Sequence, residues 1–151
     1  ILIDADEVGI EKRISEINGI LKKVGIEVEF KYINEFQKDI KNDIEIACHI
    51  LNIDDKGSLD NILKTIAKGK SEYADCLKAW KECLEDKGES VSDTIFTKFW
   101  VNNYLRFDTC DKEEQKKSSK KCNFEKALEK DFWDFEHKSL DSLKDFLKLF
   151  Q

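Results

Sequence analysis

The sequence predicts an α/β fold, in which helices flank a mostly parallel sheet and a helical region forms the C-terminal part. Three observations near the N-terminus lead to this expectation. The apolar residues 1–3 end in Asp4 and Asp6, as a buried strand does where it reaches the edge of a sheet. Apolar side chains then recur at helical spacing as far as Gly25. Residues 26–32 alternate between apolar and charged side chains.

The order strand, helix, strand predicts a crossover unit with two parallel strands. A helix is predicted from about residue 8, with Gly25 as its C-terminal stop, because one face carries Ile10, Ile14, Ile17, Leu21 and Val24. The period-2 pattern of residues 26–32 is typical of a strand with one face in solvent. A further strand is expected over residues 44–53, followed by a turn at residues 54–57.

Helices dominate the rest of the prediction. Apolar residues predict short helices over residues 59–66 and 73–84. Ser90 and Asp93 resemble a capping box that opens a third helix. Ser139 is expected to cap a last helix, whose apolar face is formed by Leu140, Leu143, Phe146, Leu147 and Phe150. We therefore expect an α/β core over residues 1–56 and a helical extension over residues 57–151, packed on the same domain.

Composition narrows the class of protein. The chain has 151 residues, of which 40% are hydrophobic, and this is enough for one compact domain with a sizeable core. Its net charge of -6 comes from interleaved charges of both signs. This balance argues against a protein that coats nucleic acid nonspecifically, but not against a nuclease, whose metal site is itself acidic.

The sequence contains no apolar stretch long enough to span a bilayer and no secretory leader, so we expect a cytoplasmic protein without membrane contacts.

The five cysteines form no C-x-x-C pair, which argues against a structural zinc site. Cys76 and Cys83 lie seven residues apart, in phase with the apolar residues around them. We expect both on the core face of a helix.

Asp4 and Asp6 are the principal candidates for chemistry. Two carboxylates one residue apart point the same way if the backbone stays extended, or fan around a turn where the strand ends. Either arrangement presents oxygens to one cation, and Mg²⁺ or Mn²⁺ with a phosphodiester or nucleotide substrate would suit such a pair. The competing interpretation is that a strand-end aspartate caps the next helix, here the one beginning near Val8.

Other polar residues have ordinary structural explanations. Asp54 and Asp55 could approach the same edge as Asp4, although such a pair more often forms a turn. His49 and His137 have no Cys or His partner at ligand spacing, so packing or capping is expected of each.

Residues 108–123 contain almost no apolar anchor and are predicted to form a mobile loop. The loop carries the lysines that could contact a nucleic-acid backbone, namely Lys116, Lys117, Lys120 and Lys121. A solvated loop without a ligand is the alternative interpretation of the same cluster.

The first part of the chain resembles the closing half of the Toprim domain, in which an apolar strand is followed by Asp-x-Asp, a helix and another strand. Toprim is the topoisomerase–primase module also found in overcoming-lysogenization-defect nucleases. The matching residues are Ile1-Leu2-Ile3-Asp4-Ala5-Asp6. Residues 50–63 and the tail from Phe132 onward are similar to the C-terminal extension of a small, functionally uncharacterised Toprim-like family. The resemblance covers most of the chain and implies a Toprim-like, Rossmann-like sheet with flanking helices and a helical C-terminal extension.

The resemblance implies that Asp4 and Asp6 bind the metal ion and that Asp60 is an additional acid. Toprim catalysis also uses a glutamate at the end of the domain's first strand as general acid or base. Every glutamate of this chain follows the Asp-x-Asp pair, so no catalytic residue can be assigned. Because the chain starts inside a predicted strand and contains no methionine, we expect that a segment precedes Ile1.

The leading hypothesis is therefore a Toprim-like, Mg²⁺-dependent enzyme that hydrolyses or transfers phosphodiesters on nucleic acid. Haloacid-dehalogenase phosphatases also place Asp-x-Asp after a buried strand, but here Glu7-Val8 follows where they have threonine and a small apolar residue. Nucleases of the PIN type lack support because no later acidic strands are evident. The alternative from another class is a non-catalytic Toprim-like module that binds a protein partner, which exposure of Trp80, Trp100 and Trp133 on one patch would favour.

Overall fold

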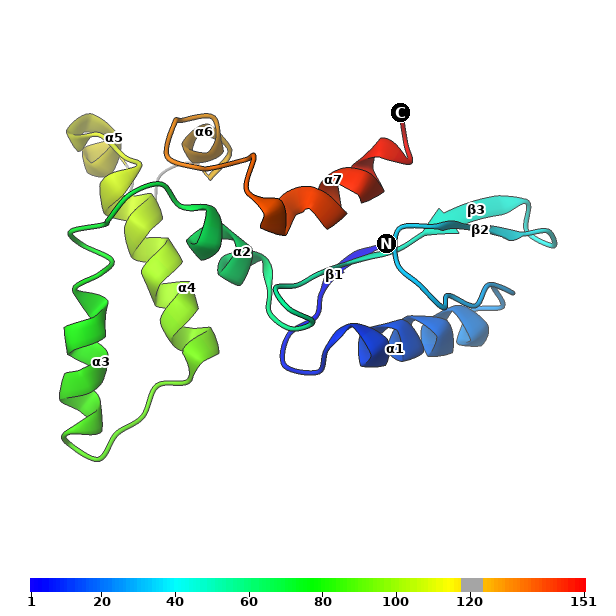
Figure 1. Cartoon of the computed structure of the whole chain (residues 1–151), viewed down its shortest axis with the longest axis horizontal. Helices are drawn as coiled ribbons and strands as arrows, with labels where there is room; N and C mark the ends of the chain where they lie inside the picture. The colour runs from blue at the N-terminus through cyan, green and yellow to red at the C-terminus, as the bar shows by residue number, and fades with distance from the viewer. Residues whose placement is uncertain (118–123) are drawn as a thin grey trace. The chain divides into compact units, whose positions relative to one another are not determined.

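The computed structural model describes residues 1–117 and 124–151, and it divides them into two compact units. Unit 1 contains residues Ile1–Ile62 and Glu136–Gln151, and unit 2 contains residues Leu63–Phe135. The chain can be followed through both in Figure 1. Among the described residues, no helix combines the length and apolar character needed to cross a membrane.

Unit 1 is a small mixed α/β unit. Its elements in chain order are β1 (Leu2–Asp4), α1 (Ile10–Lys23), β2 (Phe36–Asp39), β3 (Ile44–Ala47), β4 (His49–Leu51), the start of α2 (Leu59–Ile66), the 3-10 helix η2 (Lys138–Leu140) and α7 (Asp141–Lys148). β1 and β4 are parallel and pair Leu2 with His49, Ile3 with Ile50 and Asp4 with Leu51. β2 and β3 form a separate antiparallel pair.

The core of unit 1 lies between α1 and the strands. Its buried residues are Ala5, Ile17, Leu21, Val28, Phe30, Cys48 and Ile50. All three residues of β4 are buried, as expected for a parallel strand covered on both faces. The helical spacing of Ile17 and Leu21 turns one face of α1 towards this core, which confirms the predicted helix.

The predicted strand over residues 26–32 is wrong, although its pattern of burial is right in the middle of the segment; Tyr32, which the alternation placed on the buried face, is 67% exposed. Val28 and Phe30 are buried while Glu27 and Glu29 are exposed, as the alternation predicted. The segment nevertheless joins no ladder among the described residues, and β1 pairs with β4 instead. The predicted mostly parallel sheet is therefore reduced to one parallel pair and one antiparallel pair, and the Rossmann-like part of the expectation stays unconfirmed.

Unit 2 is helical. It contains the end of α2, α3 (Leu77–Glu85), α4 (Asp93–Asn103), the π-helix η1 (Tyr104–Asp108), α5 (Lys112–Lys117) and α6 (Phe124–Leu128). Tyr104 lies at its centre and is 1% exposed. Its ring stacks on Trp100 at 5.1 Å between centroids and meets the edge of Trp133 at 5.3 Å. This aromatic cluster is the core of the unit.

Three expectations about unit 2 need correction. Cys76 and Cys83 are both exposed: Cys76 directly precedes α3, and α3 itself contributes no fully buried residue. The N-cap of α4 is Ser92, whose hydroxyl accepts a hydrogen bond from the N–H of Ile95, rather than Ser90. Within the predicted loop over residues 108–123, Thr109 and Cys110 are buried and residues 112–117 form α5, while residues 118–123 lie outside the described residues.

Candidate functional site

The Asp-x-Asp sequence lies where the parallel strands β1 and β4 end. Asp4 is the last residue of β1, and the N–H of Ala5 then donates to the carbonyl of Leu51 at 2.9 Å. Asp6 forms an antiparallel bridge with Gly57, through N···O distances of 2.7 and 2.8 Å. The turn after β4 is thus hydrogen-bonded to the acidic pair. We call Asp4, Asp6, Asp54 and Asp55 the acidic rim.

The backbone turns sharply at the acidic rim. Asp6 has a φ of 50°, and Asp54 and Asp55 have φ angles of 50° and 81°. This left-handed region is more accessible to aspartate than to most other residues, because its short side chain can hydrogen-bond locally. The two carboxylates of the Asp-x-Asp pair therefore fan around a turn and do not project from one extended strand.

Two rim carboxylates cap helices. Asp4 Oδ1 accepts a hydrogen bond from the N–H of Leu59 at 2.9 Å, at the start of α2. Asp55 Oδ1 accepts one from the N–H of Ile10 at 3.0 Å, at the start of α1. Capping was predicted as the alternative role of Asp4, but with α1 as its helix. In the structure Asp55 caps α1 and Asp4 caps α2.

Gly9 makes room for the Asp55 cap. It has a φ of 85°, and a Cβ atom placed on it would lie 2.7 Å from Asp55 Oδ2. Both the backbone conformation and the close carboxylate therefore require glycine at this position. The start of α1 at Gly9 and the turn after β4 at Asp55 are therefore in direct contact.

Arg13 is the functional candidate that the sequence analysis missed. Its Nη2 lies 2.5 Å from Asp6 Oδ2, and its Nη1 lies 2.6 Å from Glu16 Oε2. Its Nε donates to the backbone carbonyl of Asp4 at 3.1 Å. Hydrogen bonding to Glu16, followed by that to Asp6, raises the pKa of Arg13. A sequence signal existed, because the chain has only two arginines and one of them follows the acidic pair by seven residues.

The rim provides hard oxygen ligands for a cation, although few of them. Asp4 Oδ2 accepts no hydrogen bond from the described residues, and the Asp6 side chain is about half exposed. Asp60 follows Leu59 in the first turn of α2, at the end that Asp4 caps. No three acidic, histidine or cysteine side chains gather as a metal site in the described part of the chain. This donor set fits Mg²⁺, which binds one or two protein carboxylates and keeps several waters.

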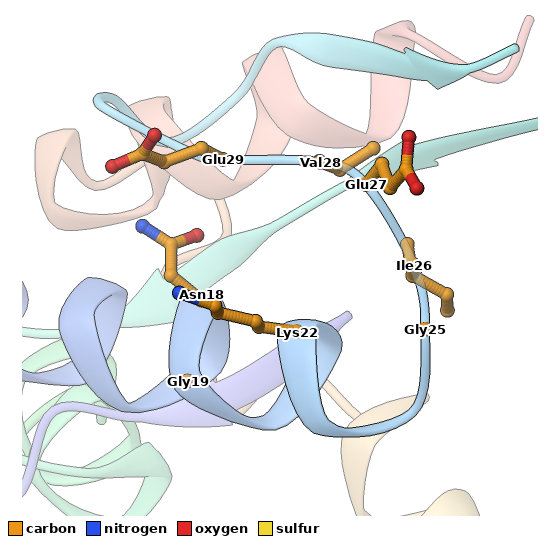
Figure 2. A pocket seen from close by; sticks show the side chains of 8 residues that line it. All are labelled: Asn18, Gly19, Lys22, Gly25, Ile26, Glu27, Val28 and Glu29. Carbon is orange, nitrogen blue, oxygen red and sulfur yellow. The ribbon is translucent and has the colours of Figure 1, made fainter.

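A cavity of about 610 Å³ lies elsewhere in unit 1, beside the C-terminal half of α1. Figure 2 shows the residues that line it, which are Asn18, Gly19, Lys22, Gly25, Ile26, Glu27, Val28 and Glu29. The side chain of Asn18 bridges one end by bonding both the N–H and the carbonyl of Phe30 at 2.8 Å. None of the predicted site residues lines this cavity, so it does not contribute to the acidic rim.

The predicted lysine cluster is described only in part. Lys116 lies in α5 and is exposed, and Lys117 is the last residue of that helix. Lys120 and Lys121 lie outside the described residues.

Of the three tryptophans, Trp100 and Trp133 are buried and belong to the core of unit 2, whereas Trp80 is 37% exposed and packs on Phe99. The three therefore do not form one exposed patch.

His49 is a packed histidine, as expected. It is 2% exposed, its Nδ1 lies 2.7 Å from Asn34 Oδ1, and its ring stacks on Phe146 of α7. Asn34 in turn donates to the carbonyl and hydroxyl of Ser142. These contacts fix α7 against β4, and burial lowers the pKa of His49.

Acidification is expected to lower the free energy of unfolding through His49. Its ordinary pKa is 6.5 and burial lowers the folded value, so the unfolded chain binds the proton first as the pH falls. This contribution is fully present above about pH 6.5 and is lost as the pH falls towards the folded pKa. Urea denaturation between about pH 7.5 and about pH 5.5 should reveal it. His49→Gln should show a shallower pH dependence, and an equal slope in both proteins would contradict the assignment.

Comparison with known proteins identifies one family. The model of the family described as "Protein of unknown function (DUF3226)" matches residues 1–151. No curated protein and no solved structure matches the chain. The family description gives no activity, so the functional argument depends on the chemistry of this chain's own residues.

Proposed function

We propose that this chain, which belongs to the DUF3226 family, is a Toprim-like, Mg²⁺-dependent enzyme that hydrolyses or transfers phosphodiesters on nucleic acid. The observation that supports the proposal best is the parallel pairing of β1 and β4, which sets Asp4 and Asp6 at the carboxyl edge of the strands. In α/β proteins ligands bind at this edge, outside the carboxyl ends of parallel strands. Mn²⁺ would satisfy the same oxygen ligands.

Asp4 and Asp6 are the proposed metal ligands, and Asp60 at the start of α2 is the additional acid. A bound Mg²⁺ would neutralise charge on the phosphate and orient it for in-line attack by water. The protein's own contribution is to hold the carboxylates in place. The N–H of Leu59 orients the Asp4 carboxylate, and Gly57 holds the backbone of Asp6 by hydrogen bonds to both its N–H and its carbonyl. Lys116 and Lys117 of α5, with Lys120 and Lys121, are the proposed contacts to the nucleic-acid backbone.

Calorimetric titration of Mg²⁺ and Mn²⁺ tests the proposal directly. The unmodified protein should bind the ion and the Asp4→Asn/Asp6→Asn variant should not. Cleavage of plasmid DNA and of single-stranded RNA, compared with and without EDTA, should fall at least about a hundred-fold in the variant, because a metal supplies several kcal/mol of charge stabilisation.

The matched control is Asp43→Asn/Asp145→Asn, which removes two carboxylates of unit 1 that lie outside the acidic rim. This control should bind the ion and cleave like the unmodified protein. Equal metal binding in the unmodified protein and in the Asp4→Asn/Asp6→Asn variant would contradict the proposed site. Absence of binding and of cleavage in every protein would favour the non-catalytic module.

A further inference from the structure

Arg13 occupies the acidic rim in the way that a bound cation would. Its guanidinium contacts one carboxylate of the Asp-x-Asp pair, Asp6, at 2.5 Å and the backbone carbonyl of the other, Asp4, at 3.1 Å. Its side chain is 23% exposed, and those of its partners Asp6 and Glu16 are 49% and 43% exposed, so both ion pairs lie at the surface. The positive charge nearest to Asp6 is therefore supplied by the chain itself.

Glu16 gives Arg13 a second carboxylate partner. Glu16 lies one turn further along α1, and its Oε2 is 2.6 Å from Arg13 Nη1. If Asp6 turns to another cation, Arg13 keeps the Glu16 pair and its contact with the Asp4 carbonyl. The guanidinium can therefore remain beside the rim when its contact with Asp6 is lost, because Glu16 still provides a negative charge.

From these contacts we infer that Arg13 is a built-in competitor for the divalent ion at Asp6 and sets the affinity of the rim for metal. This inference rests on the proposed function, since it concerns regulation of the same site. Binding of the ion exchanges one ion pair for another: the Arg13 Nη2–Asp6 contact breaks, and Asp6 Oδ2 becomes available to the ion. The released N–H groups of Arg13 then lie beside the rim, where they can donate to a phosphate oxygen of the substrate.

Calorimetric titration of Mg²⁺ and Mn²⁺ into Arg13→Gln tests the inference. Exposed ion pairs contribute about 0.2–1 kcal/mol, so removing the competitor should tighten ion binding by about 1.4- to five-fold. The matched control is Lys12→Gln, which removes the same charge from an exposed neighbour in α1. Lys12 makes no hydrogen bond or ion pair with the rim in the described part of the chain, so this variant should change the affinity less. Glu16→Gln should act in the opposite direction and weaken binding, because Arg13 then depends more on Asp6.

Circular dichroism in EDTA checks that each variant is folded. Arg13→Lys is a second variant, which keeps the positive charge but lacks the planar guanidinium that can donate two parallel hydrogen bonds. Its affinity for the ion should be intermediate. If Arg13→Gln binds the ion no more tightly than Lys12→Gln while the unmodified protein binds it, the inference about Arg13 fails and the proposed function stands. If neither the unmodified protein nor Arg13→Gln binds the ion, both fail. Binding that appears in Arg13→Gln alone supports the competitor role.

Discussion

Replacing Trp133 by alanine is expected to lower the free energy of unfolding by about 3–5 kcal/mol, the usual cost of deleting a large buried aromatic side chain. Trp133 is 2% exposed and its indole N–H donates to the carbonyl of Ala127 at 2.8 Å. Its backbone bridges to Ala67, and its ring meets the edge of Tyr104. The substitution therefore opens a cavity and also leaves the carbonyl of Ala127 with only the longer hydrogen bond from the N–H of Lys130, at 3.4 Å.

Urea denaturation followed by circular dichroism measures this effect without relying on tryptophan fluorescence. Trp80→Ala is the matched control, because Trp80 is 37% exposed and belongs to a helix that buries no residue. It should cost clearly less than Trp133→Ala. Equal losses in the two variants would show that the aromatic cluster around Tyr104 is not the core of unit 2.

Helices were the most predictable part of this fold. The spacing of Ile17 and Leu21 and the stop at Gly25 predicted α1 to within about two residues at either end, because helix formation depends on neighbours within a few positions. The burial of α3 was not predictable in the same way. Its apolar period is real, but whether that face is covered depends on another element, so Cys76 and Cys83 were wrongly placed in the core.

The partners of strands and caps were the least predictable part. The caps that Asp4 and Asp55 provide join residues 55 and 45 positions apart in sequence. A pattern of neighbouring residues contains no information on such pairs. The link between the acidic pair and Arg13 is different, because Arg13 lies only seven positions after Asp6. It depends on how the turn at Asp6 faces α1, which the spacing alone does not determine.

The segment after α1 shows this limit most clearly. Its alternation correctly separated the buried Val28 and Phe30 from the exposed Glu27 and Glu29, because alternation reports only which side chains face the core. It does not report what satisfies the backbone. Here side chains replace a neighbouring strand: Asn18 bonds both backbone groups of Phe30, and Asp39 accepts from the N–H of Glu27 at 3.1 Å.

Replacing Asn18 by alanine is therefore expected to lower the free energy of unfolding by about 1–3 kcal/mol, although alanine is the better helix former. The loss follows because Asn18 makes the two hydrogen bonds that a ladder partner would make to Phe30, and Phe30 is 2% exposed. Asn18→Asp should fall in between, since it keeps the acceptor for the N–H of Phe30 and loses the donor to its carbonyl. Urea denaturation measures all three proteins.

Asn102→Ala in α4 is the matched control, because Asn102 is an exposed helical asparagine that bonds only a carbonyl of its own helix. It should change the free energy of unfolding by no more than about 0.5 kcal/mol. If Asn18→Ala were as neutral as Asn102→Ala, the backbone of residues 26–32 would have to be satisfied by another partner.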